Sequence, residues 1–347
     1  MKEKVKKIVV IGAGGYIGTT LVDLLLKENY FVIGIDRYFF GKELLGKDVL
    51  QNQRFSLLQK DIRNLGSDDF ADCDVVINLA GLSNDPSCEL DPNLTNDINY
   101  VGSVDAAKSA KKAGVAHYVF SSSCSVYGHG SNAALTEESE LYPISEYAKA
   151  KVNAEKAILN LTDENYSVTV LRNSTVYGHS KRARFDLVIN LMTLTAWQDK
   201  KVYIMGGGKQ WRPIIHVSDV AKAFKAVIEA DNKLVNKQIF NVGSTKHNYQ
   251  VFQISNMIKK VIPETELITV PDDADKRSYN VSFDKIQSVL NFNPTITPLE
   301  GIKEIKEALD NGIINPKDVR TVTVKYYRYL LDAERIIREV GLNGKVF

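Results

Sequence analysis

Cysteine and tryptophan are scarce in this sequence, with three and two residues in 347. Cys73, Cys88 and Cys124 have neither the paired spacing of metal ligands nor the density of a disulfide-stapled secreted domain. We therefore expect free thiols, no metal site and a reducing, cytoplasmic environment.

Long apolar runs and an excess of one charge are also missing. The basic start leads only to a short apolar run that breaks at Gly12, which fits neither a signal peptide nor a membrane span. The 44 Lys and Arg residues nearly balance the 42 Asp and Glu residues, so no global field favours nucleic acid or a membrane surface. The partner expected of such a chain is a small molecule.

A strand, a glycine turn, a helix and a second strand open the chain. The β-branched run 7–11 is typical of a central parallel strand, and glycines follow it at positions 12, 15 and 18. These glycines allow a tight turn, close approach of the backbone to a pyrophosphate, and close packing of helix on strand. The pattern predicts a dinucleotide site with Gly12, Gly15, Tyr16, Ile17 and Gly18 as cofactor-binding residues.

Further cofactor contacts are predicted where the next strands end. Asp36 closes the second strand, where a carboxylate accepts hydrogen bonds from the ribose hydroxyls of adenosine and repels the extra phosphate of NADP. We therefore expect NAD, although Arg37 beside it adds a positive charge. Asn99, on the helix-like stretch 96–113, either ties neighbouring strands together or is a surface amide. The remaining predicted cofactor contacts are Arg37, Asp61, Ile62, Leu79, Ala80, Gly81, Asn99, Tyr147 and Lys151.

A strand end rich in hydroxyls and a helix with a tyrosine and a lysine form the candidate catalytic stretch. A strand ending at Phe120 leads into Ser121, Ser122 and Ser123, and a helix is predicted from the capping residue Ser145. Tyr147 and Lys151 are four residues apart on that helix, so both project from one face. Such a pair suits removal of a proton from an alcohol while a hydride leaves its carbon.

The energetics explain why a lysine would be needed. Bringing a phenol of pKa about 10 near neutrality requires roughly 4 kcal/mol, which is the order of energy that one cation about 4 Å away supplies at an effective dielectric near 20. The pattern is not unique, because Tyr38/Lys42 and Tyr177/Lys181 have the same spacing. Glycines at 41 and 178 make those two segments poor helices, so we favour Tyr147 and Lys151.

Beyond residue 178 the alternation of strand and helix becomes irregular, which indicates a second lobe. We expect an α/β fold: a doubly wound parallel Rossmann sheet with a smaller, discontinuous C-terminal substrate-binding lobe. The predicted units are an NAD-binding domain over 1–178, to which segments near 212–242 return, a substrate-binding lobe over 179–312, and a helical extension over 313–347.

Taken together, these residues resemble the extended short-chain dehydrogenase/reductase family, in its sugar-nucleotide epimerase/dehydratase branch. The resemblance covers roughly 7–308. It rests on GAGGYIG, Asp61-Ile62, NLAG, SSSCSVYG, YAKAK, LRNSTVYG, RPIIHVSDV and the stretch KRSY at 276–279.

This resemblance implies roles for individual residues. The catalytic serine, tyrosine and lysine of the family fall on Ser123, Tyr147 and Lys151, and the substrate is a nucleoside diphosphate sugar that is oxidised at C4 by NAD. Arg212 and Arg277 match positions that contact the substrate diphosphate, which guanidinium groups bind in bidentate fashion, and surface ion pairs are the alternative. The implied substrate set is Ser83, Ser123, Asn173, Asn190, Arg212 and Arg277.

Departures from the family pattern narrow the reaction. Dehydratases of this branch carry an Asp-Glu pair directly after the catalytic hydroxyl, and here those positions are Cys124 and Ser125. The glutamate typical of decarboxylases is also missing nearby. We therefore expect a 4-epimerase. A 4-keto-sugar reductase and a non-catalytic, NAD-binding regulatory protein are the alternatives.

The tail from Pro316 onward runs past the usual end of the family. Apolar residues recur at helical spacing through Tyr326, Leu330 and Ile337, which predicts an amphipathic helix packed on the body of the protein or on a second subunit. Intramolecular packing is the expected case, and a homodimer is the alternative.

Overall fold

The first strand, β1 (Lys7–Ile11), lies inside the main sheet of the computed structural model, between β4 and β2. The structure describes residues 6–128, 134–271, 277–342 and 345. Its side chains alternate between two apolar cores, with Ile8 and Val10 in one and Val9 and Ile11 in the other. A continuous β-branched run suits this place because parallel strands are covered on both faces. Lys276, predicted within the KRSY stretch, lies outside the described residues.

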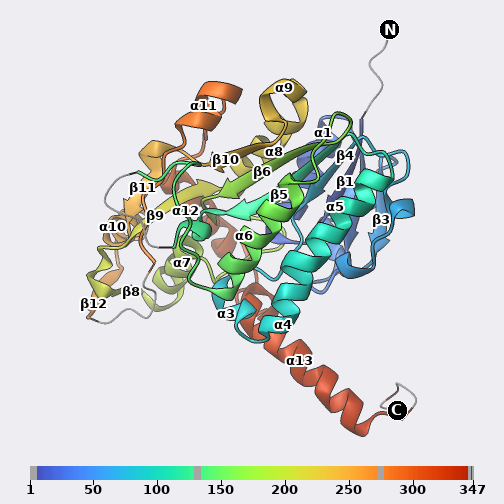
Figure 1. Ribbon diagram of the computed structural model, residues 1–347. Helices are drawn as coiled ribbons and strands as arrows, with labels where there is room; N and C mark the ends of the chain where they lie inside the picture. Colours follow the sequence, from blue (N-terminus) through green and yellow to red (C-terminus); the bar gives the residue numbers. More distant parts are fainter. Residues whose placement is uncertain (1–5, 129–133, 272–276, 343–344, 346–347) are drawn as a thin grey trace.

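The main sheet has seven parallel strands, which confirms the doubly wound fold (Figure 1). The chain builds β1, β2 and β3 outward in one direction and then β4, β5, β6 and β10 in the other. A crevice forms at the carboxyl ends of the strands where this direction reverses, between β1 and β4. Across the sheet the strands are β10 (Gln238–Val242), β6 (Ser167–Asn173), β5 (His117–Ser123), β4 (Val75–Asn78), β1, β2 (Phe31–Asp36) and β3 (Phe55–Gln59).

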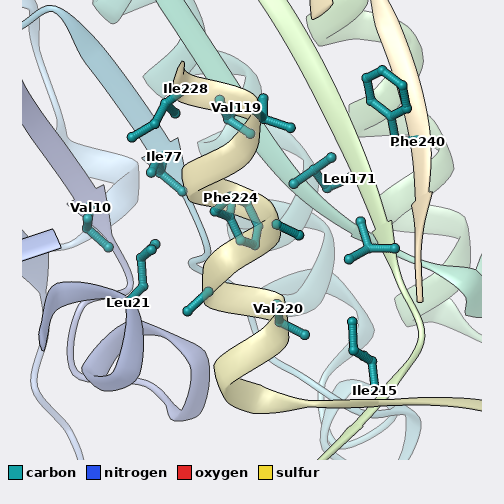
Figure 2. Packing of buried hydrophobic residues seen from close by; sticks show 14 of the residues in the cluster. Val10, Leu21, Ile77, Val119, Leu171, Ile215, Val220, Phe224, Ile228 and Phe240 are labelled. Atoms are coloured by element: carbon teal, nitrogen blue, oxygen red, sulfur yellow. The ribbon is translucent and has the colours of Figure 1, made fainter. Parts of the chain in front are cut away.

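Helices cover both faces of this sheet. On one face α1 (Tyr16–Lys27) packs beside α8 (Val217–Glu229), and on the other lie α5 (Ser103–Lys112) and α6 (Glu146–Leu159). Both α8 and the edge strand β10 come from the stretch 212–242, so this part of the chain contributes to the Rossmann layers. Figure 2 shows the first face, where Val220, Phe224 and Ile228 of α8 lie among Val10, Ile77, Val119 and Leu171 of the sheet, with Leu21 of α1 beside them.

The second lobe has an apolar cluster of its own. Helices α7 (Val188–Asp199), α10 (Val251–Val261) and α12 (Pro298–Asp310) enclose it together with the parallel pair β8 (Lys201–Met205) and β12 (Glu266–Val270). A three-stranded sheet links the lobes and contains β7 (Thr175–Tyr177), β9 (Trp211–His216) and β11 (Asn248–Gln250).

Short elements connect these layers. Strand β5 continues through Ser123 instead of ending at Phe120 as predicted, because pairing with β6 extends along the serines. The short elements are η1 (Lys42–Leu45), α2 (Lys47–Leu50), η2 (Ile62–Asn64), η3 (Ser67–Phe70), α3 (Asp85–Cys88), α4 (Pro92–Thr95), the π-helix η4 (Asn96–Gly102), η5 (Cys124–Tyr127), η6 (Gly206–Gly208), α9 (Asn232–Val235), η7 (Thr245–His247), α11 (Asp284–Leu290) and η8 (Val319–Thr321).

The C-terminal helix α13 (Thr323–Val340) is packed along only part of its length. The Tyr326 hydroxyl donates to the carbonyl oxygen of Phe39 at 2.7 Å, and its ring lies 5.5 Å from that of Phe40. Farther along, Ile337 and Val340 are 44% and 57% exposed, and Figure 1 shows the helix extending away from the body. The expected intramolecular packing therefore holds for the first half of the helix and is wrong for the second.

The described residues include neither a helix suited to span a membrane nor a metal-binding cluster. Within those ranges, no helix combines the length and the apolar character that crossing a membrane requires. The same ranges contain no cluster of three or more His, Cys, Asp or Glu side chains able to hold a metal ion. All three cysteines are free and buried.

Candidate active site

The glycine turn between β1 and α1 is shaped by contacts that exclude side chains. Gly12 has φ +88°, and a Cβ there would lie 2.8 Å from the Ala80 nitrogen at the end of β4. A Cβ at Gly18 would lie 2.0 Å from the carbonyl oxygen of Gly12. The turn therefore packs tightly against β4 and α1, and the amino end of α1 opens into a cavity of about 720 Å³.

Most of the predicted site residues line this one cavity, although they come from all parts of the chain. The two exceptions are Asn99 and Asn190. The lining includes Gly12, Gly15, Tyr16, Ile17, Gly18, Asp36, Arg37, Asp61, Ile62, Leu79, Ala80, Gly81, Ser83, Ser123, Tyr147, Lys151, Asn173, Arg212 and Arg277.

Both exceptions are buried amides bonded to neighbouring protein groups. Asn99 accepts from the Leu82 amide at 2.7 Å and donates to the Leu82 carbonyl at 2.9 Å, so it holds the loop after β4. Asn190 accepts from the Gly178 amide at 3.1 Å and donates to the Tyr16 hydroxyl at 3.1 Å. Asn99 thus ties local backbone together, and Asn190 joins α7 to the glycine turn.

The carboxylates at the strand ends have different surroundings. Asp36 accepts from the amides of Gly14 and Tyr38 at 3.0 and 2.7 Å, and burial raises the pKa of this carboxyl. Asp61 pairs with Arg63 through two bonds of 2.9 and 2.8 Å, and these hydrogen bonds lower the pKa of Asp61 to about 2. Arg37 also reaches Asp61, at 3.1 Å. The Asp36 carboxylate thus lines the cavity without a carboxylate–arginine pair, whereas Asp61 is held in an ion pair.

Helix α6 begins as predicted, because the Ser145 hydroxyl accepts from the Ala148 amide at 3.2 Å. One turn later the Lys151 ammonium donates to the Ser121 carbonyl at 2.8 Å and lies 5.8 Å from the centre of the Tyr147 ring. Burial lowers the pKa of Lys151 to about 8, so the amine stays mostly protonated at neutral pH. The two predicted helical groups and the serine-rich end of β5 therefore meet at one wall of the cavity.

The Tyr147 phenol has a hydroxyl partner, but its pKa does not shift as the sequence argument expected. Ser123 accepts from the Ser125 amide at 3.2 Å and hydrogen-bonds to Tyr147, which lowers the pKa of the phenol. Burial is the larger cause and raises the pKa of Tyr147 above its usual value. We expected Lys151, with a nicotinamide cation adding to its effect, to lower this pKa. In the protein without its cofactor the cost of burying a phenolate outweighs the lowering effects.

A buried ion pair behind this wall has no counterpart in the predicted site. Arg172 of β6 donates to Glu155 of α6 at 2.8 Å through one amino group and at 3.1 and 3.2 Å through Nε. Both side chains are 3% exposed, and Ser122 also donates to Glu155. Helical spacing places Glu155 one turn after Lys151, but its partner is supplied by a strand that only the folded chain brings close.

Two arginines from later parts of the chain also line the cavity. Arg212 on β9 donates to the Trp211 carbonyl at 2.9 Å and to the Arg277 carbonyl at 2.5 Å. Arg277 forms an ion pair with Asp85, which also accepts from Ser145 at the start of α6. The predicted diphosphate-binding residues are thus brought together, and Asp85 on the first lobe pairs with Arg277.

Two buried side chains, Cys124 and His216, are bonded to protein groups. Cys124 is buried, its thiol donates to the Arg172 carbonyl at 3.3 Å, and burial raises the pKa of the thiol. His216 pairs with Glu304 at 2.7 Å between Nε2 and Oε2. Cys124 and His216 are absent from the cavity lining of the described residues.

The cavity fits a dinucleotide together with a polar second ligand. Three of its lining atoms, Asn173 Oδ1, Ser125 Oγ and Arg182 Nε, are buried without a hydrogen-bond partner in the described parts of the chain. Buried polar atoms in native proteins are nearly always bonded, so these atoms suit ligand groups. The glycine turn provides the close backbone approach that a pyrophosphate needs.

The chain is similar in sequence to known proteins over most of its length. The sequence model of the NAD dependent epimerase/dehydratase family matches residues 8–243. The UDP-glucose 4-epimerase of Mycolicibacterium smegmatis is 27% identical over 314 residues, which are 88% of this chain and 99% of that protein. UDP-glucuronic acid decarboxylase 1 of Arabidopsis thaliana is 26% identical over 319 residues, 89% of this chain and 71% of that protein.

Solved structures share the fold. A UDP-glucose 4-epimerase from Thermotoga maritima, solved with UDP-glucose, superposes with a TM-score of 0.78 at 24% identity. The match covers 89% of this chain and 100% of that one. Relatives with the same architecture thus carry the names of more than one reaction.

Proposed function

This chain belongs to the NAD-dependent epimerase/dehydratase family, and from that premise we propose that it is a nucleoside diphosphate sugar 4-epimerase. NAD is the cofactor of the family. The observation that carries the proposal is the convergence of Ser123, Tyr147 and Lys151 on the cavity that the glycine turn borders.

The three side chains would share the handling of one proton. Tyr147 would take the proton of the substrate C4 hydroxyl, and Ser123, already bonded to the phenol, would hold the oxygen that loses it. Lys151 would place a positive charge below the phenolate and bond to the ribose of the cofactor. When bound, NAD accepts a hydride from C4, and its positively charged nicotinamide opposes the rise that burial causes in the pKa of Tyr147.

Epimerisation requires the resulting 4-keto sugar to present its other face before it is reduced. Tyr147 would then return the proton to the C4 oxygen, so the protein ends each cycle in its starting protonation state. The second lobe would hold the nucleotide end of the substrate during this turn. Arg212 and Arg277 suit its diphosphate because guanidinium groups bind phosphate oxygens in bidentate fashion, and a diphosphate would compete with Asp85 for Arg277.

The surroundings of Ser123 argue against a dehydratase. Loss of the C6 hydroxyl in dehydratases uses an acid and base directly after the catalytic hydroxyl. Here the next residue, Cys124, is buried with a raised pKa, and Ser125 is a neutral hydroxyl. Neither group can act as that couple. A uridine diphosphate sugar is the substrate class we favour, because the relatives compared above are named for UDP-sugars.

Replacement of the base tests this proposal. We expect Tyr147→Phe to lower the rate of interconversion of UDP-glucose and UDP-galactose, or of the corresponding glucuronates, by about a thousandfold while NAD still binds. Tyr142→Phe is the matched control, since Tyr142 is 57% exposed, and it should keep the parent rate. Parent-level activity in Tyr147→Phe would contradict the assignment.

Two further outcomes separate the alternatives. An epimerase keeps its dinucleotide through desalting and works without added cofactor, because the hydride returns to the substrate. Strict dependence on added NADH with a 4-keto sugar would instead identify a reductase. Tight NAD binding with no sugar nucleotide bound or oxidised would identify a regulatory protein.

A further inference from the structure

Arg182 is a buried arginine that faces the cavity and has no carboxylate partner among the described residues. Arg182 is 3% exposed, and one of its amino groups donates to the Thr323 hydroxyl at 2.9 Å. The Nε atom has no hydrogen-bond partner within the described ranges. Burial lowers the pKa of this guanidinium to about 10, so the group is still charged at neutral pH. The carboxylates of Asp36 and Asp186 attract this charge without forming an ion pair with it. The buried, unbonded Nε–H therefore suits an anionic ligand.

The surroundings of Arg182 place it at the dinucleotide end of the cavity. The guanidinium carbon lies 3.7 Å from the centre of the Phe40 ring, four residues beyond Asp36. Two residues before Arg182, the Ser180 hydroxyl donates to the Tyr16 carbonyl at 2.7 Å and contacts the Thr19 hydroxyl at 2.9 Å. The segment carrying Arg182 is therefore bonded to the first turn of α1, whose free amides face phosphates in dinucleotide sites.

The C-terminal helix completes this corner. Thr323, the first residue of α13, holds Arg182, and Val324 and Tyr327 on the same helix line the cavity. The Tyr327 ring lies 5.8 Å from that of Phe40, against which Arg182 stacks. A segment beyond residue 316, where the family resemblance has ended, thus forms part of the wall.

We propose that Arg182, positioned by Thr323 of the C-terminal helix, binds the diphosphate of the dinucleotide from the side opposite the amino end of α1, and that Val324 and Tyr327 cover it. The α1 amides and the Arg182 Nε–H would then donate to the same diphosphate from two directions. Charge-assisted bonds of this kind are stronger than neutral ones, and desolvation by the apolar and aromatic cover strengthens them further.

The dinucleotide fits this place better than the sugar nucleotide does. Arg182 is tied to Phe40 and Thr323 and lies close to the Asp36 strand end, whereas Arg212 and Arg277 are bonded to each other and to Asp85. The inference rests on NAD binding by the family and not on the 4-epimerase reaction. Its test measures binding alone, so its failure would leave the proposed reaction untouched.

The experiment compares ligands with and without phosphate. Full-length Arg182→Gln, cleared of bound nucleotide, is titrated with NAD, ADP and adenosine by calorimetry. We expect the affinity for NAD and ADP to fall by about tenfold to a hundredfold, while the affinity for adenosine stays unchanged. Arg328→Gln, which removes an exposed arginine of the same helix, is the control and should bind all three ligands as the parent does.

Three results would overturn the proposal. Equal losses for ADP and adenosine would make Arg182 a structural support without a phosphate contact. Unchanged NAD binding with a raised KM for the sugar nucleotide would assign the arginine to the substrate diphosphate. Should Arg182→Gln fail to fold, Thr323→Val removes only the positioning hydroxyl, and we expect a few-fold loss of NAD affinity. Parent affinity in that variant would contradict the role of α13.

Discussion

Helices α6 and α13 both border the cavity, but they are held in different ways. Helix α6 is capped by Ser145, buries Lys151, and is fixed to β6 through the buried pair of Glu155 and Arg172. Helix α13 is attached by its first turns only, through Thr323 and Tyr326, and its last two turns are exposed.

This difference in attachment matches the roles that we propose for the two helices. Groups that exchange a proton with the substrate must hold their geometry closely, and side chains on a well-packed helix do so. A cover over the cofactor needs to contact it without fixing the reacting atoms. Because its last turns are exposed, the end of α13 should add little to the stability of the domain, whereas the buried groups of α6 should add much.

The largest effect is expected from breaking the buried ion pair of α6. Arg172→Met leaves the Glu155 carboxylate buried without its partner, which should lower the free energy of unfolding by about 3–5 kcal/mol. Urea denaturation measures this change. The double variant Arg172→Met/Glu155→Met should recover part of the loss.

The control for that variant lies on α13. Arg338 pairs with Glu334 at 2.6 Å, and both side chains are mostly exposed. Arg338→Met should change stability by less than about 1 kcal/mol, because exposed pairs contribute little. Equal losses in Arg172→Met and Arg338→Met would remove the contrast between the two helices.

A smaller effect should appear in the dependence of stability on pH. Burial lowers the pKa of Lys151 from 10.5 to about 8, so below pH 8 the folded and unfolded states are both protonated and the cost of burying the charge is fully present. Between pH 8 and 10.5 the native state releases the proton while the unfolded state keeps it, so stability rises with pH.

The matched variant isolates this titration. Below pH 8, Lys151→Met should have a higher free energy of unfolding than the parent. The difference between the two proteins should shrink by up to about 3 kcal/mol between pH 8 and 10.5. Parallel pH profiles of the two proteins, measured by urea denaturation, would show that Lys151 is not buried as a charged amine.

The smallest effect is expected at the exposed end of α13. Ile337→Ser and Val340→Ser should each change the free energy of unfolding by less than about 0.5 kcal/mol, because neither side chain is buried. The corresponding change on α6, Ile158→Ser, empties a fully buried position and should cost at least about 2 kcal/mol. A large loss at Ile337 with a concentration-dependent midpoint would indicate that a second copy covers this end.

The local parts of the fold and of the site could be predicted from the sequence. The glycine spacing, the Ser145 cap and the four-residue step from Tyr147 to Lys151 depend on neighbouring residues, so their geometry follows from helix and turn rules. For the same reason the apolar runs identified the central strands of the sheet.

What could not be predicted depends on distant pairings. Arg182 acquires its place from Thr323, and Arg277 pairs with Asp85, which lies 192 positions earlier in the chain. Burial, which decides the direction of the pKa shift at Tyr147, is also a property of the packed fold. Spacing rules carry no information about which surfaces meet, so these features required coordinates.

The Tyr16 side chain sets a condition on how the two lobes can move. Its hydroxyl donates to the Gly178 carbonyl at 2.6 Å and accepts from Asn190 of α7, and its carbonyl accepts from Ser180. The glycine turn and the beginning of the second lobe are thus bonded directly. A hinge for opening the cleft cannot pivot at this point without breaking these buried bonds, so the segment 178–190 and the cofactor turn should move as one rigid body.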